Sequence, residues 1–462
     1  MVHETTKVHG HEVTVTTTST STVAPALPSQ EQRLALSNLD LLLPPMDVGV
    51  FFCYAGAGQG AAVAAPAPIL KVSLAKVLVA YYPLAGEVVA NAAGEAELLC
   101  SGRGVDFAEA SAGGAELRDL RLGMVDESAD KLVPKKKAGV MCVQVTKFKC
   151  GGAVVGCTFD HRVCDAYSFN MFLVAWAAAA RGSSVTLAPS FDRSFLAPSN
   201  PPPPCPDALA DRLFVPVSCV SAPPATAAVT NRIYRVAADD VAALQESAGH
   251  GRGRRTKLEA FTAHLWQLYA RAAASSGQRR TCCMGVVVDG RTRLRRDGAM
   301  KGYFGNVLTI PYGVKGSDDL RGMALADAAD DVHRWVVEAA TGDHFRGLID
   351  WVESLRPEPT VAKAYLGGGD GFGDGAGATA CVVSSGMRFP VGEVDFGWGR
   401  PAFASYHFPW PGGAGYVMPM PSARGDGDWM VYVHAAPEVV TAMEQEPTVF
   451  KALDCDYVFD RV

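Results

Sequence analysis

Hydrophobic positions in the first 190 residues form two kinds of pattern. The segments 48–54, 140–145 and 153–159 are short, nearly continuous apolar runs, which predicts strands. Residues 166–181 instead show the spacing of a helix. We therefore expect residues 1–190 to form one α/β domain.

The periodic pattern stops between residues 188 and 226. The prolines at 201–204 and 206 favour an extended, polyproline-like chain, which predicts a linker over residues 191–225. Residues 226–462 are expected to form a second α/β domain. Its predicted strands are 231–236, 284–288, 307–310, 379–383 and 429–433, and its predicted helices are 239–247, 256–274 and 327–340.

Composition and charge narrow the class of protein. Of 462 residues, 48% are apolar and 19% are charged, as in a folded globular protein. The formal charge of -6 gives no broad attraction to nucleic acid or anionic lipid, so a dedicated nucleic-acid-binding protein is disfavoured. The longest apolar run, 171–180, is about half of the roughly 20 residues that a membrane-spanning helix needs.

The cysteines and the N-terminus indicate a cellular compartment. No apolar secretory signal follows the polar start of the chain, and the 12 cysteines are dispersed among apolar segments. We interpret them as free thiols and expect a cytoplasmic monomer with no bound metal or cofactor. The glycine-rich tract at 367–377 is predicted to be a mobile loop, because its partial match to a calcium-binding repeat does not recur.

A candidate catalytic residue lies where the predicted strand 153–159 meets the predicted helix 166–181. This junction carries His161 and, four residues later, Asp165. A histidine with an unperturbed pKa of about 6.5 suits a general base, and Asp165 is placed to cap the helix or hold a cation. The HxxxD spacing alone is weak, since His434 and Glu438 repeat it with another carboxylate. A structural histidine is the alternative interpretation.

The DFGWG motif at 395–399 is much rarer by chance than HxxxD. Its first three letters match the kinase DFG, but the chain has neither an HRD catalytic loop nor a VAIK-like lysine. A GxGxxA run at 56–61 follows a predicted strand, yet Pro66 and Pro68 are expected to break the helix that a dinucleotide site requires. We interpret residues 56–61 as an exposed loop.

Two other chemistries are disfavoured by the residue pattern. Cys157, His161 and Cys164 have no further ligand pair that would complete a zinc site. The chain also contains no GxSxG nucleophile elbow, which argues against an ordinary serine hydrolase.

The HxxxD and DFGWG motifs together resemble the pair found in the plant BAHD acyltransferases, which use acyl-CoA thioesters. The resemblance covers nearly the whole chain and includes LSNLD at 36–40, YPLAG at 82–86, TKLEA at 256–260 and GYFGN at 302–306. It implies two chloramphenicol acetyltransferase-like α/β domains joined by a crossover loop, at the position of the predicted linker. In such proteins the active-site channel lies at the domain interface.

The resemblance also implies roles for individual residues. His161 is implied to remove the proton of the acceptor hydroxyl, so that the alkoxide attacks the thioester directly. Asp165 is implied to pair with an arginine, for which Arg291 is the match, rather than to polarise His161. Ser384 matches a threonine whose hydroxyl faces the reacting groups.

Two regions are expected to support the CoA donor. Asp395, Gly397 and Trp398 of the DFGWG motif are implied to be structural support near CoA. Arg254 and Lys257 form a basic cluster at a predicted helix start, where free N–H groups and the positive end of the helix dipole suit phosphates. A merely solvated basic surface is the alternative there.

The expected activity is acyl-CoA-dependent O-acylation of a phenylpropanoid alcohol, with acetyl or hydroxycinnamoyl as the acyl group. The chain resembles the branch of the family that acylates coniferyl alcohol, in segments such as LSNLDLLLPP and FFCY. Shikimate and quinate users carry an arginine in the window occupied here by the 367–377 tract, which favours a neutral acceptor. The alternatives are shikimate- or quinate-type hydroxycinnamoyl transfer and a ligand-binding protein without turnover.

Overall fold

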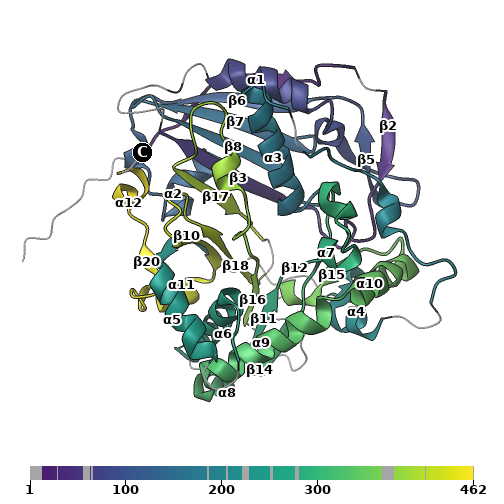
Figure 1. Ribbon diagram of the computed structural model, residues 1–462, viewed down its shortest axis with the longest axis vertical. Helices are drawn as coiled ribbons and strands as arrows, with labels where there is room; N and C mark the ends of the chain where they lie inside the picture. Colours follow the sequence, from purple (N-terminus) through teal and green to yellow (C-terminus); the bar gives the residue numbers. More distant parts are fainter. Residues whose placement is uncertain are drawn as a thin grey trace, which may run out of the picture.

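Two large β-sheets, each covered by helices, form the molecule (Figure 1). The computed structural model describes residues 13–28, 30–55, 63, 66–184, 187–203, 207–220, 228–249, 253–275, 280–366, 379–410 and 413–460. The N-terminal half of the chain supplies most of one sheet and the C-terminal half supplies the other. This two-sheet α/β architecture agrees with the fold that the motifs imply.

The first sheet has the strand order β1-β6-β7-β8-β3-β17. β6 runs parallel to β7, and the other neighbouring pairs are antiparallel. The central strands are almost wholly buried because they are nearly continuous apolar runs. Helices α1 and α3 pack against each other in front of this sheet (Figure 1). The bounds are β1 (Thr16–Val23), β3 (Asp47–Tyr54), β6 (Val105–Ala112), β7 (Met141–Phe148), β8 (Ala153–Asp160), β17 (Phe403–His407), α1 (Pro66–Val77) and α3 (Ala166–Ala180).

The second sheet has the strand order β14-β11-β16-β18-β19-β10-β20. Helix α6 is the central helix on it and contacts α5, α8, α9 and α11. Trp266 of α6 is fully buried in the hydrophobic core formed there. The bounds are β10 (Thr230–Val236), β11 (Thr281–Val286), β14 (Tyr312–Gly316), β16 (Thr379–Val383), β18 (Gly415–Pro421), β19 (Trp429–Ala435), β20 (Lys451–Ala452), α5 (Ala238–Gly249), α6 (Lys257–Ser275), α8 (Ser317–Gly322), α9 (Leu325–Ala339) and α11 (Pro437–Glu444).

Strand β17 crosses from the second half of the chain into the first sheet. It pairs antiparallel with β3, so that Phe403 lies opposite Cys53 and His407 opposite Gly49. All five residues of β17 are buried. One strand from the predicted domain 226–462 therefore belongs to the other sheet, because the apolar β17 forms its edge.

The predicted linker, 191–225, contains regular structure as well as an extended segment. It includes η4 (Arg193–Leu196), α4 (Ala208–Leu213), β9 (Phe214–Pro216) and η5 (Val217–Cys219), and β9 pairs with β15 (Thr360–Ala362). The predicted linker therefore holds short helices and a short strand after its proline run. Leu213 and Phe214 are buried in the core, and this anchors the segment.

Most other predicted elements are confirmed within a few residues. The elements β3, β7, β8, α3, β10, α5, α6, α9, β16 and β19 lie where the apolar spacing places them. The predicted strand 284–288 is interrupted after Val286 and resumes as β12 (Val288–Asp289), and 307–310 shortens to β13 (Leu308–Thr309). Residues 56–61 and 367–377 lie outside the described residues.

One local prediction is wrong at the start of α1. Pro66 is the first residue of this helix and Pro68 the third, so these prolines do not prevent a helix. Proline is tolerated in a first helical turn, because the N–H that it lacks has no intrahelical partner there.

Smaller elements complete the fold and frame the site. A three-stranded sheet has the order β2-β5-β4, and β12 pairs with β13. The bounds are β2 (Gln32–Ala35), β4 (Glu87–Ala90), β5 (Ala96–Cys100), η1 (Tyr82–Ala85), η2 (Leu117–Asp119), α2 (Val125–Ser128), η3 (Ala129–Lys131), α7 (Arg291–Leu294), η6 (Ala299–Gly302), α10 (Gly342–Leu355), η7 (Lys363–Tyr365), η8 (Val391–Glu393) and α12 (Cys455–Phe459).

Within the described ranges, no helix is long and apolar enough to cross a membrane. The same residues contain no group of three or more His, Cys, Asp or Glu that could hold a metal ion. The cysteines at described positions are unpaired. Burial raises the pKa of Cys142 to about 12, which keeps its thiol protonated.

Candidate active site

A cavity of about 1100 Å³ lies between the two halves of the chain. Its lining includes His161, one face of α3, the start of α6, the segment 286–301 and residues 384–393. Ligand sites for one small molecule usually measure roughly 300–1000 Å³, so this cavity has room for a large ligand or for two.

The backbone of His161 is fixed from two sides. His161 directly follows β8, and its N–H donates to the Met46 carbonyl at 2.9 Å. Its own carbonyl accepts a hydrogen bond of 2.9 Å from the Asn306 side-chain amide. The imidazole ring meets the Phe408 ring edge-on, with 5.6 Å between centroids. Groups from both halves of the chain thus hold His161 at the cavity wall.

Burial lowers the pKa of His161 below its usual value of 6.5. The residue's own carbonyl, Asp165 and Asp160 oppose this shift without cancelling it. Nδ1 is buried and has no hydrogen-bond partner among the described residues, and His161 lines the cavity. A neutral imidazole at the cavity wall has the protonation state that a general base requires.

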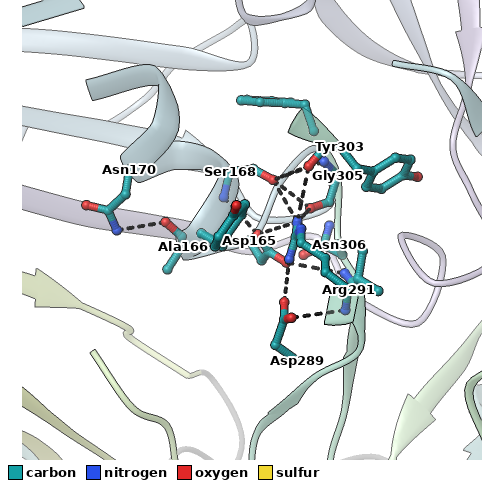
Figure 2. A network of polar contacts seen from close by, with 12 residues as sticks. Asp165, Ala166, Ser168, Asn170, Asp289, Arg291, Tyr303, Gly305 and Asn306 are labelled. Atoms are coloured by element: carbon teal, nitrogen blue, oxygen red, sulfur yellow. Dashed lines mark hydrogen bonds and ion pairs between the residues drawn. The ribbon is translucent and has the colours of Figure 1, made fainter. Parts of the chain in front are cut away.

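Asp165 and Arg291 form a buried ion pair that joins the two halves (Figure 2). Arg291 Nη1 donates to Asp165 Oδ2 at 2.8 Å, and Arg291 Nη2 donates to Oδ1 at 3.0 Å. Only 2% of Asp165 and 3% of Arg291 is exposed. Asp165 also caps α3 by accepting the Ser168 N–H at 3.0 Å and accepts the Val307 N–H at 3.2 Å.

Arg291 is held by a wider set of partners (Figure 2). It donates to Asp289 Oδ2 at 2.5 Å, to Ser168 Oγ at 2.9 Å and to the Gly305 carbonyl at 2.9 Å. The guanidinium also lies 4.3 Å from the centroid of the Tyr167 ring. Both oxygens of Asp165 are occupied by these donors rather than by His161, so the geometry suits a structural role for the pair.

Asn306 and Asp40 form a second buried link between the two halves of the chain. Both residues lie in motifs noted in the sequence, but the motifs did not reveal that the two side chains meet. The Asn306 side-chain amide donates to Asp40 Oδ1 at 2.9 Å, and the Asn306 backbone N–H donates to the same oxygen at 2.6 Å. Asp40 belongs to the LSNLD segment and Asn306 to GYFGN. The available signal was that each of the two motifs ends in a polar side chain able to form several hydrogen bonds.

Ser384 lines the cavity immediately after β16, and aromatic rings stand beside it. Its backbone N–H donates to the Val417 carbonyl at 3.0 Å. Tyr416 stacks on Phe408 with 4.1 Å between ring centroids, and Tyr365 lies nearly parallel to Phe408 with 6.1 Å between centroids. Tyr365, Phe408 and Tyr416 all line the cavity, and we call them the aromatic wall.

The DFGWG motif forms a rigid loop outside the cavity lining. Asp395 Oδ1 accepts the N–H groups of Gly397, Trp398 and Gly399 at 2.8, 3.1 and 3.0 Å. Gly397 and Gly399 have φ values of 100° and 91°, which favour glycine. Trp398 packs edge-on against Tyr54 of β3, with 5.4 Å between centroids.

The position of this loop supports a structural role. The side chain of Arg181, at the end of α3, donates to the Asp395 carbonyl and also lines the cavity. Asp395, Gly397 and Trp398 themselves are absent from the described cavity lining. They hold neighbouring elements in place and do not form the cavity surface.

Arg254 and Lys257 are exposed and do not line the cavity, although Thr256 and Leu258 do. The free N–H groups predicted at this helix start are partly taken, because α6 begins with a capping box. The Glu259 N–H donates to Thr256 Oγ1 at 3.2 Å, and the Glu259 carboxylate accepts the Thr256 N–H at 2.7 Å. The cluster is therefore a surface beside the cavity, and its N-terminal helix end already carries an anion.

The sequence analysis missed a set of cations that do line the cavity. Four of them follow Arg291 along the chain: Arg293, Arg295, Arg296 and Lys301. All four are exposed, and Arg388 is another exposed cation of the lining. The sequence signal was the RTRLRR run at 291–296, of which only the first arginine was assigned a role.

Solved structures of known proteins share the fold of this chain. Vinorine synthase is similar with a TM-score of 0.72 and 21% identity, over 95% of this chain and 99% of that one. F. graminearum TRI101 in complex with coenzyme A and T-2 mycotoxin is similar with a TM-score of 0.69 and 15% identity, over 90% of this chain and 97% of that one. These likenesses establish a two-domain α/β fold.

Sequence comparison supplies the family. The Transferase family profile matches residues 13–449. Putrescine hydroxycinnamoyltransferase 1 of Oryza sativa subsp. japonica is 31% identical over 90% of this chain and 93% of its own length. Shikimate O-hydroxycinnamoyltransferase of Nicotiana tabacum is 27% identical over 90% and 95%, respectively. The chain belongs to the Transferase family, that of the BAHD acyltransferases, and is an acyltransferase.

Proposed function

We propose that this acyltransferase transfers an acetyl or hydroxycinnamoyl group from acyl-CoA to the hydroxyl of a neutral phenylpropanoid alcohol such as coniferyl alcohol. The aromatic wall beside His161 carries the proposal. Phe408 lies 5.6 Å from the His161 ring and 4.1 Å from Tyr416, so flat rings flank the reacting position. Such a wall favours planar aromatic substrates through stacking and apolar burial.

The charges near His161 support a neutral acceptor. Arg291 is engaged by Asp165 and Asp289 and has no spare charge for a carboxylate. Leu39 and Leu42 line the cavity, which adds apolar surface. The 367–377 window contains two aspartates and no arginine in the sequence. A carboxylate that entered beside His161 would lose its hydration without gaining a cationic partner from Arg291 or from this window.

The mechanism follows from the position of His161. Nε2 removes the proton of the acceptor hydroxyl while the oxygen forms a bond to the thioester carbonyl carbon. The Ser384 hydroxyl is the proposed donor to the resulting oxyanion. Collapse breaks the carbon–sulfur bond, and the CoA thiolate takes the proton back from the imidazolium. The ester and CoA leave, and His161 is neutral again.

A grid of donors and acceptors tests this function. Thiol release and product mass are measured with acetyl-CoA and p-coumaroyl-CoA, each against coniferyl alcohol and shikimate. We expect kcat/KM for coniferyl alcohol to exceed that for shikimate by at least about a hundredfold with the preferred donor. Comparable values would overturn the proposal in favour of shikimate- or quinate-type transfer.

Arg388 gives this experiment a second arm. It is exposed and lines the cavity near Ser384, so it is the described cation best placed to hold an acceptor carboxylate. If shikimate is used and Arg388→Gln abolishes only that use, the carboxylated-acceptor function is correct. Binding of CoA without thiol release from either donor would identify a ligand-binding protein without turnover.

A further inference from the structure

The segment 302–306, which carries the GYFGN motif, lies between the linker and the proposed base. Its last residue, Asn306, donates to the carbonyl of His161. Its first residues contact the chain from Ala188 to Arg193, where the linker begins. The reaction described above gives this contact no role, although it connects the linker to a segment that touches His161.

Backbone hydrogen bonds join the start of the linker to this segment. The Ser190 N–H donates to the Gly302 carbonyl at 2.7 Å, and the Phe304 N–H donates to the Ser190 carbonyl at 2.9 Å. Ser190 and Tyr303 thus form a parallel bridge. A Cβ at Gly302 would lie 2.7 Å from the Ala188 carbonyl oxygen, which is too close for any side chain. Glycine at 302 therefore allows the two chains to pack backbone against backbone.

Arg193, in η4 of the linker, contacts the same segment through its side chain. Its Nη1 donates to the Tyr303 hydroxyl at 2.8 Å and to the Phe304 carbonyl at 2.7 Å. The guanidinium also lies 5.2 Å from the centroid of the Tyr303 ring. A Cβ at Gly305 would lie 2.8 Å from Nη1 and 2.9 Å from the Tyr303 ring. Both glycines of the GYFGN motif therefore leave room for the linker.

Arg193 also faces the carboxylate that binds Asn306. Arg193 Nη2 lies 3.6 Å from Asp40 Oδ2, and Asp40 is fully buried. The same Oδ2 accepts the N–H and the hydroxyl of Ser37 at 2.9 and 2.7 Å. A buried carboxylate needs hydrogen bonds and a nearby positive charge, and Arg193 supplies the charge.

Short polar contacts therefore connect the linker to His161. Arg193 pairs with Asp40, whose Oδ1 accepts the Asn306 amide at 2.9 Å. The same amide donates to the His161 carbonyl at 2.9 Å. Such contacts strengthen one another when they are buried, because the local dielectric is low. A shift of Arg193 would thus alter the hydrogen bond that fixes the backbone of His161.

We propose that Arg193 is a positioning residue for the reaction. It holds the start of the linker against the GYFGN segment and, through Asp40 and Asn306, fixes the backbone of His161. This inference rests on the proposed role of His161 as the base. The linker then supports the active site in addition to connecting the two halves of the chain.

Kinetics of two Arg193 variants test the proposal. Arg193→Gln removes the charge and most of the donors, whereas Arg193→Lys keeps the charge. Arg193 is absent from the described cavity lining, so substrate binding should change little. We expect Arg193→Gln to lower kcat by about tenfold or more while both KM values stay within about threefold. Arg193→Lys should stay within about threefold of the wild-type kcat. Raised KM values with an unchanged kcat would overturn the positioning role.

Arg235→Gln is the matched control. Arg235 pairs with the buried Asp428 at 2.6 Å and lies 4.2 Å from the centroid of the Tyr457 ring, so its partners resemble those of Arg193. It belongs to β10 of the second sheet and has no contact path to His161 among the interactions described above. We expect a lower melting temperature with kcat of the folded protein within about twofold of wild type. An equal loss of kcat in Arg193→Gln and Arg235→Gln would overturn the proposal.

A double-mutant cycle separates this inference from the proposed function. Arg193→Gln and Asp40→Asn are made singly and together, and both kcat and the urea midpoint of unfolding are measured. We expect each change to have a smaller effect when the other is present, because both break the same contact. Additive effects on unfolding would overturn the contact whatever the kinetics show. Absence of wild-type turnover with every acyl-CoA would contradict the proposed function, and the unfolding cycle would then test the contact by itself.

Discussion

The side-chain amide of Asn306 donates a hydrogen bond of 2.9 Å to the backbone carbonyl of His161. The two residues are 145 positions apart and come from different halves of the chain. Because Asn306 also binds Asp40 through two donors, it fixes the proposed base relative to the LSNLD segment as well. The GYFGN motif thus acts on the site through the backbone of His161.

Replacing Asn306 with alanine should harm catalysis beyond its effect on stability. The change leaves two buried acceptors short of a donor, which costs about 1–3 kcal/mol of folding free energy. A displaced His161 should lower kcat by about ten- to a hundredfold. Asn231→Ala is the control, because Asn231 binds Tyr432 and His434 in the second sheet. Equal losses of kcat in both folded variants would show that the effect is not specific to His161.

Replacing His161 with alanine should remove nearly all turnover while the affinity for CoA stays within a few fold. Loss of a general base commonly lowers kcat by about 10²- to 10⁴-fold. His434→Ala provides a comparison, because His434 is another buried histidine with a carboxylate four residues later in the sequence. More than about a tenth of the wild-type kcat in the His161 variant would exclude it as the base.

Replacing Asp165 with asparagine should destabilise the protein more than it alters the pH dependence of the reaction. Removing one partner of a buried ion pair costs about 3–5 kcal/mol, and Arg291 would keep only Asp289 as a charged partner. The measurements are the melting temperature and the pH profile of kcat in the folded fraction. An unchanged melting temperature together with a shifted profile would contradict the structural role of Asp165.

The pH profile of the wild-type enzyme follows from the lowered pKa of His161. The neutral ring is the active form, so activity falls only when the pH drops below this lowered pKa. We expect the acid limb of kcat/KM to lie below pH 6.5, the ordinary value for histidine. Asp160→Asn removes a charge that raises this pKa and should move the limb further toward acid. A limb above 6.5, or a shift toward alkaline pH in that variant, would disagree with this account.

Local sequence patterns predicted those helices and strands whose type is set by residues close to one another in the sequence. The apolar runs of β3, β7 and β8 and the spacing of α3 specify buried strands and a buried helix without reference to the rest of the chain. His161 and Asp165 could be found for the same reason, since a strand-to-helix junction is a local feature. Their partners, Asn306 and Arg291, lie far along the chain, and only the resemblance to a family suggested the latter.

Other features of the site depend on contacts that local patterns do not specify. An exposed arginine has the same sequence context whether it borders a cavity or bulk solvent, so Arg293 and Arg296 were overlooked. At the start of α6, the Thr256-x-x-Glu259 capping box occupies part of the N–H groups that the sequence suggested for phosphate. Stacking of Phe408 beside His161 depends on the pairing of β17 with β3, which no local pattern specifies.

The crossing of β17 limits how substrates can reach the base. Hinged separation of the two halves would have to break the ladder between β17 and β3 and would carry away Phe408, which directly follows β17 and contacts the His161 ring. Hinged opening of the two halves is therefore incompatible with keeping Phe408 against His161. Donor and acceptor would instead enter a cavity whose walls stay joined by the β17–β3 pairing. The rate of product release should therefore depend on the residues at the cavity openings rather than on movement between the halves.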